Sequence, residues 1–207
     1  MLCRIRQLFK VLKWQRQMRA ALSTQLALLE NPTAFALGGL TAVEDARVVE
    51  LVHTATEAAG PIIEFGTLFG LTTQLIAAEM ADGHEVITVD NFCWNPFGLP
   101  PALHEDFTRR ILRNELSGGN VSLYRGDSTT FRAAYQGATP AMVFLDADHA
   151  YEAVRDEIQW AKSLGVTVIA GHDYGNAKFG ATRAVDEAFP KGVEVRGMVW
   201  SWCSERQ

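Results

Sequence analysis

The sequence has few cysteines, no long apolar run and no internal repeat. Cys3, Cys93 and Cys203 stand far apart, without the CxxC or Cys/His spacing of a zinc site. Isolated thiols fit a reducing compartment better than a disulfide scaffold. No stretch approaches the roughly 18 apolar residues of a membrane span, and charges interrupt every apolar stretch near the N-terminus. We therefore expect a soluble, cytoplasmic protein.

An excess of basic charge is also missing. The net charge is −5 over 207 residues, which gives no electrostatic reason to expect a nucleic-acid partner. Residues 1–20 nevertheless carry six basic and no acidic side chains, so the rest of the chain has a net charge of −11. Residues 2–29 predict a helix with a broad, irregular apolar surface. Such a surface favours packing on the domain or a homo-oligomer contact over binding to an anionic membrane.

The length and composition fit one globular domain with a short extension. Hydrophobic residues make up 48 % of the chain and charged residues 21 %. We expect a helical N-terminal extension over residues 1–40 and one domain over residues 41–207. Thr41 and Glu44 match a helix capping box at the start of that domain, and Gly60-Pro61 would end the helix.

Short apolar runs alternate with helical stretches through the rest of the chain. The runs cover 61–65, 85–89, 121–124, 141–145 and 166–170. The helical stretches cover 72–80, 104–116, 131–135, 151–164 and 182–189. This alternation predicts an α/β fold with a doubly wound, mostly parallel sheet that is covered on both faces. Residues 193–195 and 198–202 follow each other without a helix and predict a closing antiparallel pair, which makes seven strands.

Acidic residues stand at or near the end of each parallel run. They are Glu64, Asp90, Asp127, Asp146 and Asp173. In an open parallel sheet, ligands bind in the crevice outside the carboxyl ends of the strands, where these five acids would meet. Any one of them alone is equally well explained as a helix cap or a turn residue. The complete set favours a ligand site.

The first of these loops, residues 64–73, reads EFGTLFGLTT. It lacks the lysine of a phosphate-binding P-loop, and Leu68 stands where the dinucleotide fingerprint has its second glycine. Glu64 would also repel a pyrophosphate. The glycines at 66 and 70 allow a ligand to approach the backbone closely. The loop therefore favours a ligand with a positive charge, such as a sulfonium bearing an α-ammonium group.

The same loop resembles the first motif of class I S-adenosylmethionine-dependent methyltransferases, in the E-x-G-x-x-x-G-x-[ST] form of the catechol and caffeoyl-CoA O-methyltransferases. Residues 144–151, FLDADHAY, and 168–174, VIAGHDY, are similar to methyltransferase family 24, whose relatives modify sugars and macrolides. The resemblance covers about residues 41–202. It implies a Rossmann-like fold, S-adenosylmethionine as cofactor and a small-molecule acceptor.

The resemblance also implies roles for individual residues. Glu64, Gly66 and Gly70 would line the methionine part of the cofactor, and Asp90 would bind the ribose hydroxyls. Asp127 and Ser128 would flank the adenine, with Asn91 and Phe92 packed beside it. Asp146 would lie at the same edge, in reach of both cofactor and metal.

Methyl transfer from a sulfonium needs no acid for the leaving group, but it needs an acceptor made anionic by a base or a metal. In the catechol-type relatives an Asp after the fourth strand binds magnesium and a residue three positions later acts as base, which corresponds to Asp146 and His149. The Asp-Asn pair of those enzymes is Asp173-Tyr174 here, which departs from a standard magnesium site. Asp146, His172 and Asp173 form an alternative metal set for Mg²⁺ or Mn²⁺, and His149 and His172 are the candidate bases.

Other interpretations stay open at this point. A nicotinamide-dependent oxidoreductase would have the same kind of sheet, but this sequence lacks the central glycine of the dinucleotide-binding loop. A hydroxylase-like relative, or a cofactor-binding scaffold without methyl transfer, is a second alternative. The loop at 91–103 is either a lid over the acceptor or a packed connector. We assign no function to His53, His84 and His104, which we expect on the surface or on a helix face.

Overall fold

The structure is a computed structural model, and it describes residues 40–204. The helix predicted over residues 2–29, and almost all of the predicted extension, lie outside the described residues. No helix among residues 40–204 is long and apolar enough to cross a membrane.

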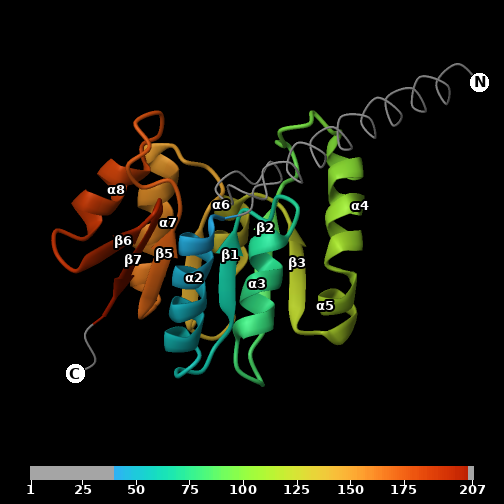
Figure 1. The fold of residues 1–207 in the computed structure, drawn as a ribbon, viewed down its shortest axis with the longest axis horizontal. Helices are drawn as coiled ribbons and strands as arrows, with labels where there is room; N and C mark the ends of the chain where they lie inside the picture. Colours follow the sequence, from blue (N-terminus) through green and yellow to red (C-terminus); the bar gives the residue numbers. More distant parts are fainter. Residues whose placement is uncertain (1–39, 205–207) are drawn as a thin grey trace, which may run out of the picture.

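The described chain alternates helices and strands, as the apolar runs predict (Figure 1). The strands are β1 (Ile62–Phe65), β2 (Val86–Asp90), β3 (Val121–Arg125), β4 (Met142–Leu145), β5 (Val168–Gly171), β6 (Val193–Arg196) and β7 (Val199–Cys203). The helices are α2 (Ala42–Ala55), α3 (Leu71–Glu79), α4 (Pro101–Ile111), α5 (Arg113–Gly118), α6 (Ser128–Ala134), α7 (Tyr151–Ser163) and α8 (Ala181–Ala188).

All seven strands form one sheet in the order β3-β2-β1-β4-β5-β7-β6. Strands β1 to β5 pair in parallel, and β7 is antiparallel to both β5 and β6. The prediction of a doubly wound, mostly parallel sheet with a closing antiparallel pair is confirmed. The order reverses between β1 and β4, which is the position where open α/β sheets bind their ligands.

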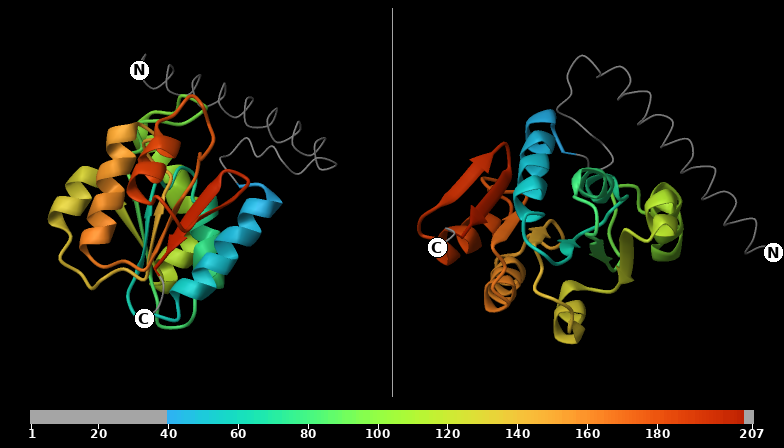
Figure 2. Two further views of the ribbon diagram at one scale, coloured as in Figure 1. Left: turned by 90° about the vertical axis from the view of Figure 1, so that its left-hand side faces the viewer. Right: turned by 90° about the horizontal axis from the view of Figure 1, so that it is seen from below.

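Alternate residues of the buried strands supply two separate apolar cores. Ile62, Met142 and Phe144 pack with α2 and α3 on one face of the sheet. Ile63 and Val143 pack with α7 and α8 on the other face. Figure 2 shows these two layers of helices on opposite sides of the strands. A strand that is buried on both faces reads as a continuous apolar run, which is why the runs were visible in the sequence.

The start of α4 differs from the prediction. The helix begins at Pro101 and not at His104, because proline has no N–H to lose and its fixed φ suits the first position of a helix. The single helix predicted over 104–116 is divided at Leu112. The side chain of Leu112 is buried against Gly70, and a Cβ on Gly70 would stand 2.7 Å from the Cγ of Leu112. Both changes bear on the site, since they place His104 inside the first turns of α4.

Candidate functional site

The site lies at the carboxyl edge of the sheet, which is the upper edge in Figure 1. The first loop leaves β1 at Gly66, which has a φ of 96°. A Cβ on this residue would stand 2.1 Å from the carbonyl oxygen of Asp146, so the loop can pass β4 only with glycine here. The loop ends at Gly70, the N-cap of α3, with a φ of 85°.

Glu64 is the most enclosed acid of this edge. Its side chain is completely buried, and its Oε2 accepts hydrogen bonds from the hydroxyls of Thr73 and Thr88. Its Oε1 is buried and has no hydrogen-bond partner among residues 40–204. Burial raises the pKa of Glu64 to about 7, although the two hydroxyls act in the opposite direction. Oε1 is therefore an acceptor that a donor on a ligand could bond.

Asp90, the last residue of β2, is already bound to the protein's own backbone. Its Oδ2 accepts hydrogen bonds from the amides of Thr67 and Leu68, at 3.0 and 2.8 Å, and its Oδ1 accepts from the amide of Phe92 at 2.6 Å. A carboxylate has about four acceptor positions, so Oδ1 retains one for a further hydroxyl donor. Asp90 therefore shapes the two adjacent loops and still offers an acceptor to a ligand.

The remaining residues predicted for the cofactor differ in their surroundings. Asn91 is exposed and accepts the amide of Cys93, while the ring of Phe92 is fully buried. Asp127 is exposed and caps α6 by accepting the amide and hydroxyl of Thr130, with Ser128 half-buried beside it. The hydrogen bond from the Thr130 amide is the main reason why the pKa of Asp127 lies below its usual value.

Two acids and two histidines meet where β4 and β5 end. Asp146, His149 and Asp173 each offer a ligand atom, and these atoms lie within 4.8 Å of one another. His149 Nδ1 lies 3.4 Å from Asp173 Oδ2. His172 Nδ1 lies 3.6 Å from the same oxygen and 3.8 Å from Asp146 Oδ1. His149 thus joins the two predicted acids in the closest cluster, and His172 stands next to it.

The charges of this cluster separate the two histidines. Burial lowers the pKa of His149, which favours the neutral ring at pH 7. Burial also acts to lower the pKa of His172, but the carboxylates of Asp173, Asp146 and Glu44 outweigh it and raise that pKa to about 9. Burial together with the neighbouring carboxylates raises the pKa of Asp146 to about 7, against the effect of His172.

Asp173 adds backbone strain to the cluster. Its φ is 62°, in the left-handed region that a residue with a side chain seldom adopts. Its Oδ1 accepts a hydrogen bond from the side chain of Asn176 at 2.8 Å. Strained residues persist where the surroundings hold them, and they concentrate at functional sites.

Glu44 reaches the same cluster from α2, and the sequence analysis assigned it only a capping role. The capping box is confirmed, because Glu44 Oε2 accepts the amide of Thr41 at 2.8 Å. Its Oε1 accepts the amide of Met198 at 2.7 Å and lies 3.3 Å from His172 Nε2. Burial raises the pKa of Glu44, but these hydrogen bonds and His172 outweigh it and bring the pKa below its usual value.

The aromatic loop after β2 combines buried and exposed residues. Leu99 and Asn95 are buried, and the Asn95 side chain bonds the backbone of Phe97 and Leu99. Trp94 has 70 % of its surface exposed, and Cys93 and Pro96 near it are exposed as well.

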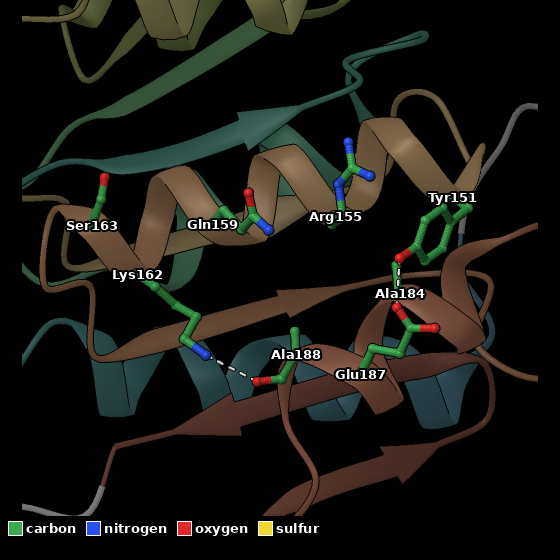
Figure 3. Close-up of a pocket in the computed structure, with 8 residues that line it drawn as sticks. All are labelled: Tyr151, Arg155, Gln159, Lys162, Ser163, Ala184, Glu187 and Ala188. Atoms are coloured by element: carbon green, nitrogen blue, oxygen red, sulfur yellow. Dashed lines mark hydrogen bonds between the residues drawn. The ribbon is translucent and has the colours of Figure 1, made fainter.

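A groove between α7 and α8 lies away from this edge (Figure 3). Tyr151 and Glu187 are joined across it by a hydrogen bond, and Arg183 lies 4.2 Å from the centre of the Tyr151 ring. Its side chains are therefore paired with one another, and none of the predicted site residues lines it.

Comparison with known families agrees with this geometry. The model of methyltransferase family 24, described as a methyltransferase domain, matches residues 63–174, more than half of the chain. The chain belongs to this family. The matched segment runs from β1 to the residue after Asp173, so it contains the glycine loop, Asp90 and the acid–histidine cluster. The prediction of a class I methyltransferase is confirmed. No curated protein sequence matches the chain.

Solved structures of low sequence identity show the same fold. The calicheamicin methyltransferase CalS11 has 15 % identity and a TM-score of 0.63, with 90 % of this chain and 92 % of that chain covered. The O-methyltransferase from Bacillus cereus in complex with SAH has 16 % identity and a TM-score of 0.61, with 90 % of both chains covered. Cofactor-bound Rv0187 from MTB has 18 % identity and a TM-score of 0.59, with 88 % of both covered.

Proposed function

We propose that this methyltransferase transfers the methyl group of S-adenosylmethionine to a hydroxyl of a small molecule, with a divalent cation at Asp146, His149 and Asp173. The observation that carries the proposal is the joint position of two features at one sheet edge. A glycine loop with a buried acid lies beside β1, and a carboxylate–imidazole cluster lies beside β4 and β5. Related folds whose names describe O-methyltransferases support the choice of a hydroxyl acceptor.

The positive charge of the cofactor suits the glycine loop and its buried acid, Glu64. The free Oε1 of Glu64 is a buried acceptor that lacks a donor, and the ammonium group of the methionine part would supply one. The glycines at 66 and 70 have positive φ and let the loop turn closely past Asp146 and Leu112. The remaining acceptor position on Asp90 Oδ1 suits a ribose hydroxyl. The adenine would lie toward Asp127 and Ser128.

The metal fits the second feature by donor chemistry. Two carboxylates and one imidazole are a common ligand set for Mn²⁺ and related ions, and the carboxylates alone suit Mg²⁺. A cation there would also relieve the repulsion between Asp146 and Asp173, which contributes to the raised pKa of Asp146. His172 lies beside these ligands, and its raised pKa keeps it protonated at neutral pH.

Each group at the site has a separate role in methyl transfer. The cofactor supplies an activated methyl group, and a bound cation would lower the pKa of the acceptor hydroxyl. Asp146 and Asp173 would hold the cation and would thereby place the acceptor oxygen at the carboxyl edge. Burial favours the neutral ring of His149 at pH 7, so its nitrogen would be free to complete the ligand set. The positive His172 balances the charge of the two acids.

Calorimetry followed by turnover tests this function. S-adenosylmethionine should bind and NAD should not. Methyl transfer should then be assayed against a panel of phenols and sugar hydroxyls, with Mg²⁺ or Mn²⁺ added and after exhaustive EDTA treatment. NAD binding would favour an oxidoreductase. Cofactor binding without turnover on any hydroxyl would favour a scaffold or a hydroxylase-like relative.

We further propose that the basic N-terminal segment mediates self-association. The support is its apolar surface in the sequence, with Ile5, Leu8 and Phe9 on one side. Deleting residues 1–30 should lower the mass measured by light scattering or cause aggregation. An unchanged mass with loss of liposome binding alone would favour a membrane contact.

A further inference from the structure

His104 lies between the two loops that are proposed to hold the cofactor. It lies on α4, which agrees with the helix-face alternative of the prediction, and its side chain is completely buried. Its Nε2 bonds the carbonyl oxygen of Leu68 in the glycine loop at 2.9 Å. Its Nδ1 lies 3.4 Å from the carbonyl oxygen of Phe92 in the loop after β2. One imidazole therefore contacts the backbone of both loops.

Both of these contacts are made to strained residues. Leu68 has a φ of 47° and Phe92 a φ of 58°, and both lie in the left-handed region. Bulky residues with a side chain reach this region only when their surroundings hold them there. Besides Leu68 and Phe92, Asp173 is the only non-glycine residue among residues 40–204 with a positive φ.

The amides of the same two residues are held by Asp90. Leu68 donates to Oδ2 and Phe92 donates to Oδ1 of this carboxylate. Both strained residues donate their N–H to Asp90. A neutral imidazole donates from one nitrogen only, so the shorter contact, from His104 Nε2 to the Leu68 carbonyl, is the hydrogen bond, and Nδ1 lies beside the Phe92 carbonyl.

Aromatic contacts hold the His104 ring in place. Its centre lies 4.9 Å from that of Phe69 and 5.1 Å from that of Phe92, both edge-on. Thr108, one turn later in α4, donates a second hydrogen bond to the Leu68 carbonyl at 2.7 Å. The ring is therefore packed to serve as a fixed donor.

We infer that His104 is a positioning residue for S-adenosylmethionine, which holds the glycine loop and the loop after β2 in the form that binds the cofactor. The inference rests on the proposed function, in which these loops bind that molecule. The energy of holding two strained peptides is then supplied by folding, so the cofactor does not have to order them on binding. His104 itself touches no reacting group.

Calorimetry with S-adenosylmethionine tests the inference on the full chain. His104→Phe keeps an aromatic ring but removes both nitrogens, and it should weaken binding roughly tenfold or more. His104→Gln retains a donor for the Leu68 carbonyl and should lose less. His84→Phe is the matched control, because His84 also bonds a backbone carbonyl, that of Gly60, at the opposite edge of the sheet. It should bind as the wild type does.

Hydrogen exchange of the ligand-free variants separates positioning from general destabilisation. His104→Phe should speed exchange in peptides covering residues 66–70 and 91–95 while the amides of β1 and β4 keep wild-type protection. Equal affinity of His104→Phe and wild type would overturn the inference, as would exchange that rises throughout the sheet. If His104→Phe does not fold, His104→Gln carries the test, and wild-type affinity and exchange in that variant overturn it. Failure of the wild type to bind would instead reject the proposed function.

Discussion

The two halves of the carboxyl edge use their acids in different ways. Beside β1 and β2, Glu64 and Asp90 accept hydrogen bonds of 3.0 Å or less from the protein's own hydroxyls and amides. Beside β4 and β5, the contacts between Asp146, Asp173 and the histidines are 3.4 to 3.8 Å long. The acids of the first half are bound mostly by the chain, which leaves Glu64 Oε1 and one position on Asp90 Oδ1 for a ligand, and the second half keeps its charges facing one another.

This difference follows from what each half is proposed to bind. A large organic cofactor needs a backbone of fixed shape, and hydrogen-bonded acids supply it. A small cation or a mobile proton needs charged groups that are close but not satisfied by the chain. The comparison predicts that changes in the first half act on cofactor affinity, while changes in the second half act on metal affinity and turnover.

The largest effect should come from Asp146→Asn. Removing one of two carboxylate ligands should lower affinity for Mn²⁺ about hundredfold or more and reduce methyl transfer by a similar factor. Cofactor affinity should change much less. Titration calorimetry with Mn²⁺ and with S-adenosylmethionine measures both. Asp148→Asn is the control, because this exposed acid bonds only the amide of Ala150 among the described hydrogen bonds. Full turnover after exhaustive EDTA treatment would show that no metal is needed.

Asp90→Ala should give the next largest effect and the opposite selectivity. It removes an acceptor for the ribose and leaves the amides of Thr67, Leu68 and Phe92 without their partner, so cofactor binding should weaken by about 1–3 kcal/mol. Affinity for Mn²⁺ should stay near the wild-type value. Asp82→Ala, at an exposed acid before β2, should change neither. Equal losses of cofactor and metal affinity in Asp90→Ala would remove the distinction between the two halves.

Most of the fold could be predicted because its signals are local. A strand buried on both faces leaves a continuous apolar run, and a capping box occupies four consecutive residues. The acids were predictable for the same reason, since each stands next to a strand that the run already identifies. Parallel strands end at one edge, so the sequence also predicted that Asp146 and Asp173 approach each other.

The contacts that join distant segments could not be predicted in this way. Glu44 was recognised as a cap, but its other partners, His172 and Met198, lie 128 and 154 residues further along the chain. For His104 the sequence predicts only a surface or helix-face position. Its role depends on two backbone carbonyls, and a carbonyl leaves no mark in the sequence.

Glu157 in α7 is a buried acid outside both halves, and it tests how burial acts on the pKa of a carboxyl. It is completely buried, and neither of its oxygens has a hydrogen-bond partner among residues 40–204. Burial raises its pKa to about 7. Because the folded state holds this proton more tightly than the unfolded state, folding stability falls as pH rises from about 4.5 to about 7, by up to about 3 kcal/mol.

Glu157→Gln removes that titration, so the variant should lose about 2–3 kcal/mol less stability than the wild type between pH 5 and pH 8. Urea denaturation at the two pH values measures the difference. The exposed acid Glu152 of the same helix provides the control, and Glu152→Gln should follow the wild type. An equal loss of stability between the two pH values in the wild type and in Glu157→Gln would mean that Glu157 has an ordinary pKa.

The smallest effect is expected from Glu44→Gln, because Glu44 belongs to α2 and not to the sheet edge beside β4 and β5. Glutamine can still close the capping box, but it removes the negative charge 3.3 Å from His172 Nε2. The pKa of His172 should therefore fall from about 9 by roughly one, because one of the carboxylates that raise it is gone. A ¹⁵N NMR titration of the His172 ring measures this change. Thr41→Ala is the matched control, since it removes the cap hydroxyl of the same helix and leaves the Glu44 charge in place. If Thr41→Ala moves the His172 titration as far as Glu44→Gln does, the effect comes from loosening of α2 and not from the carboxylate.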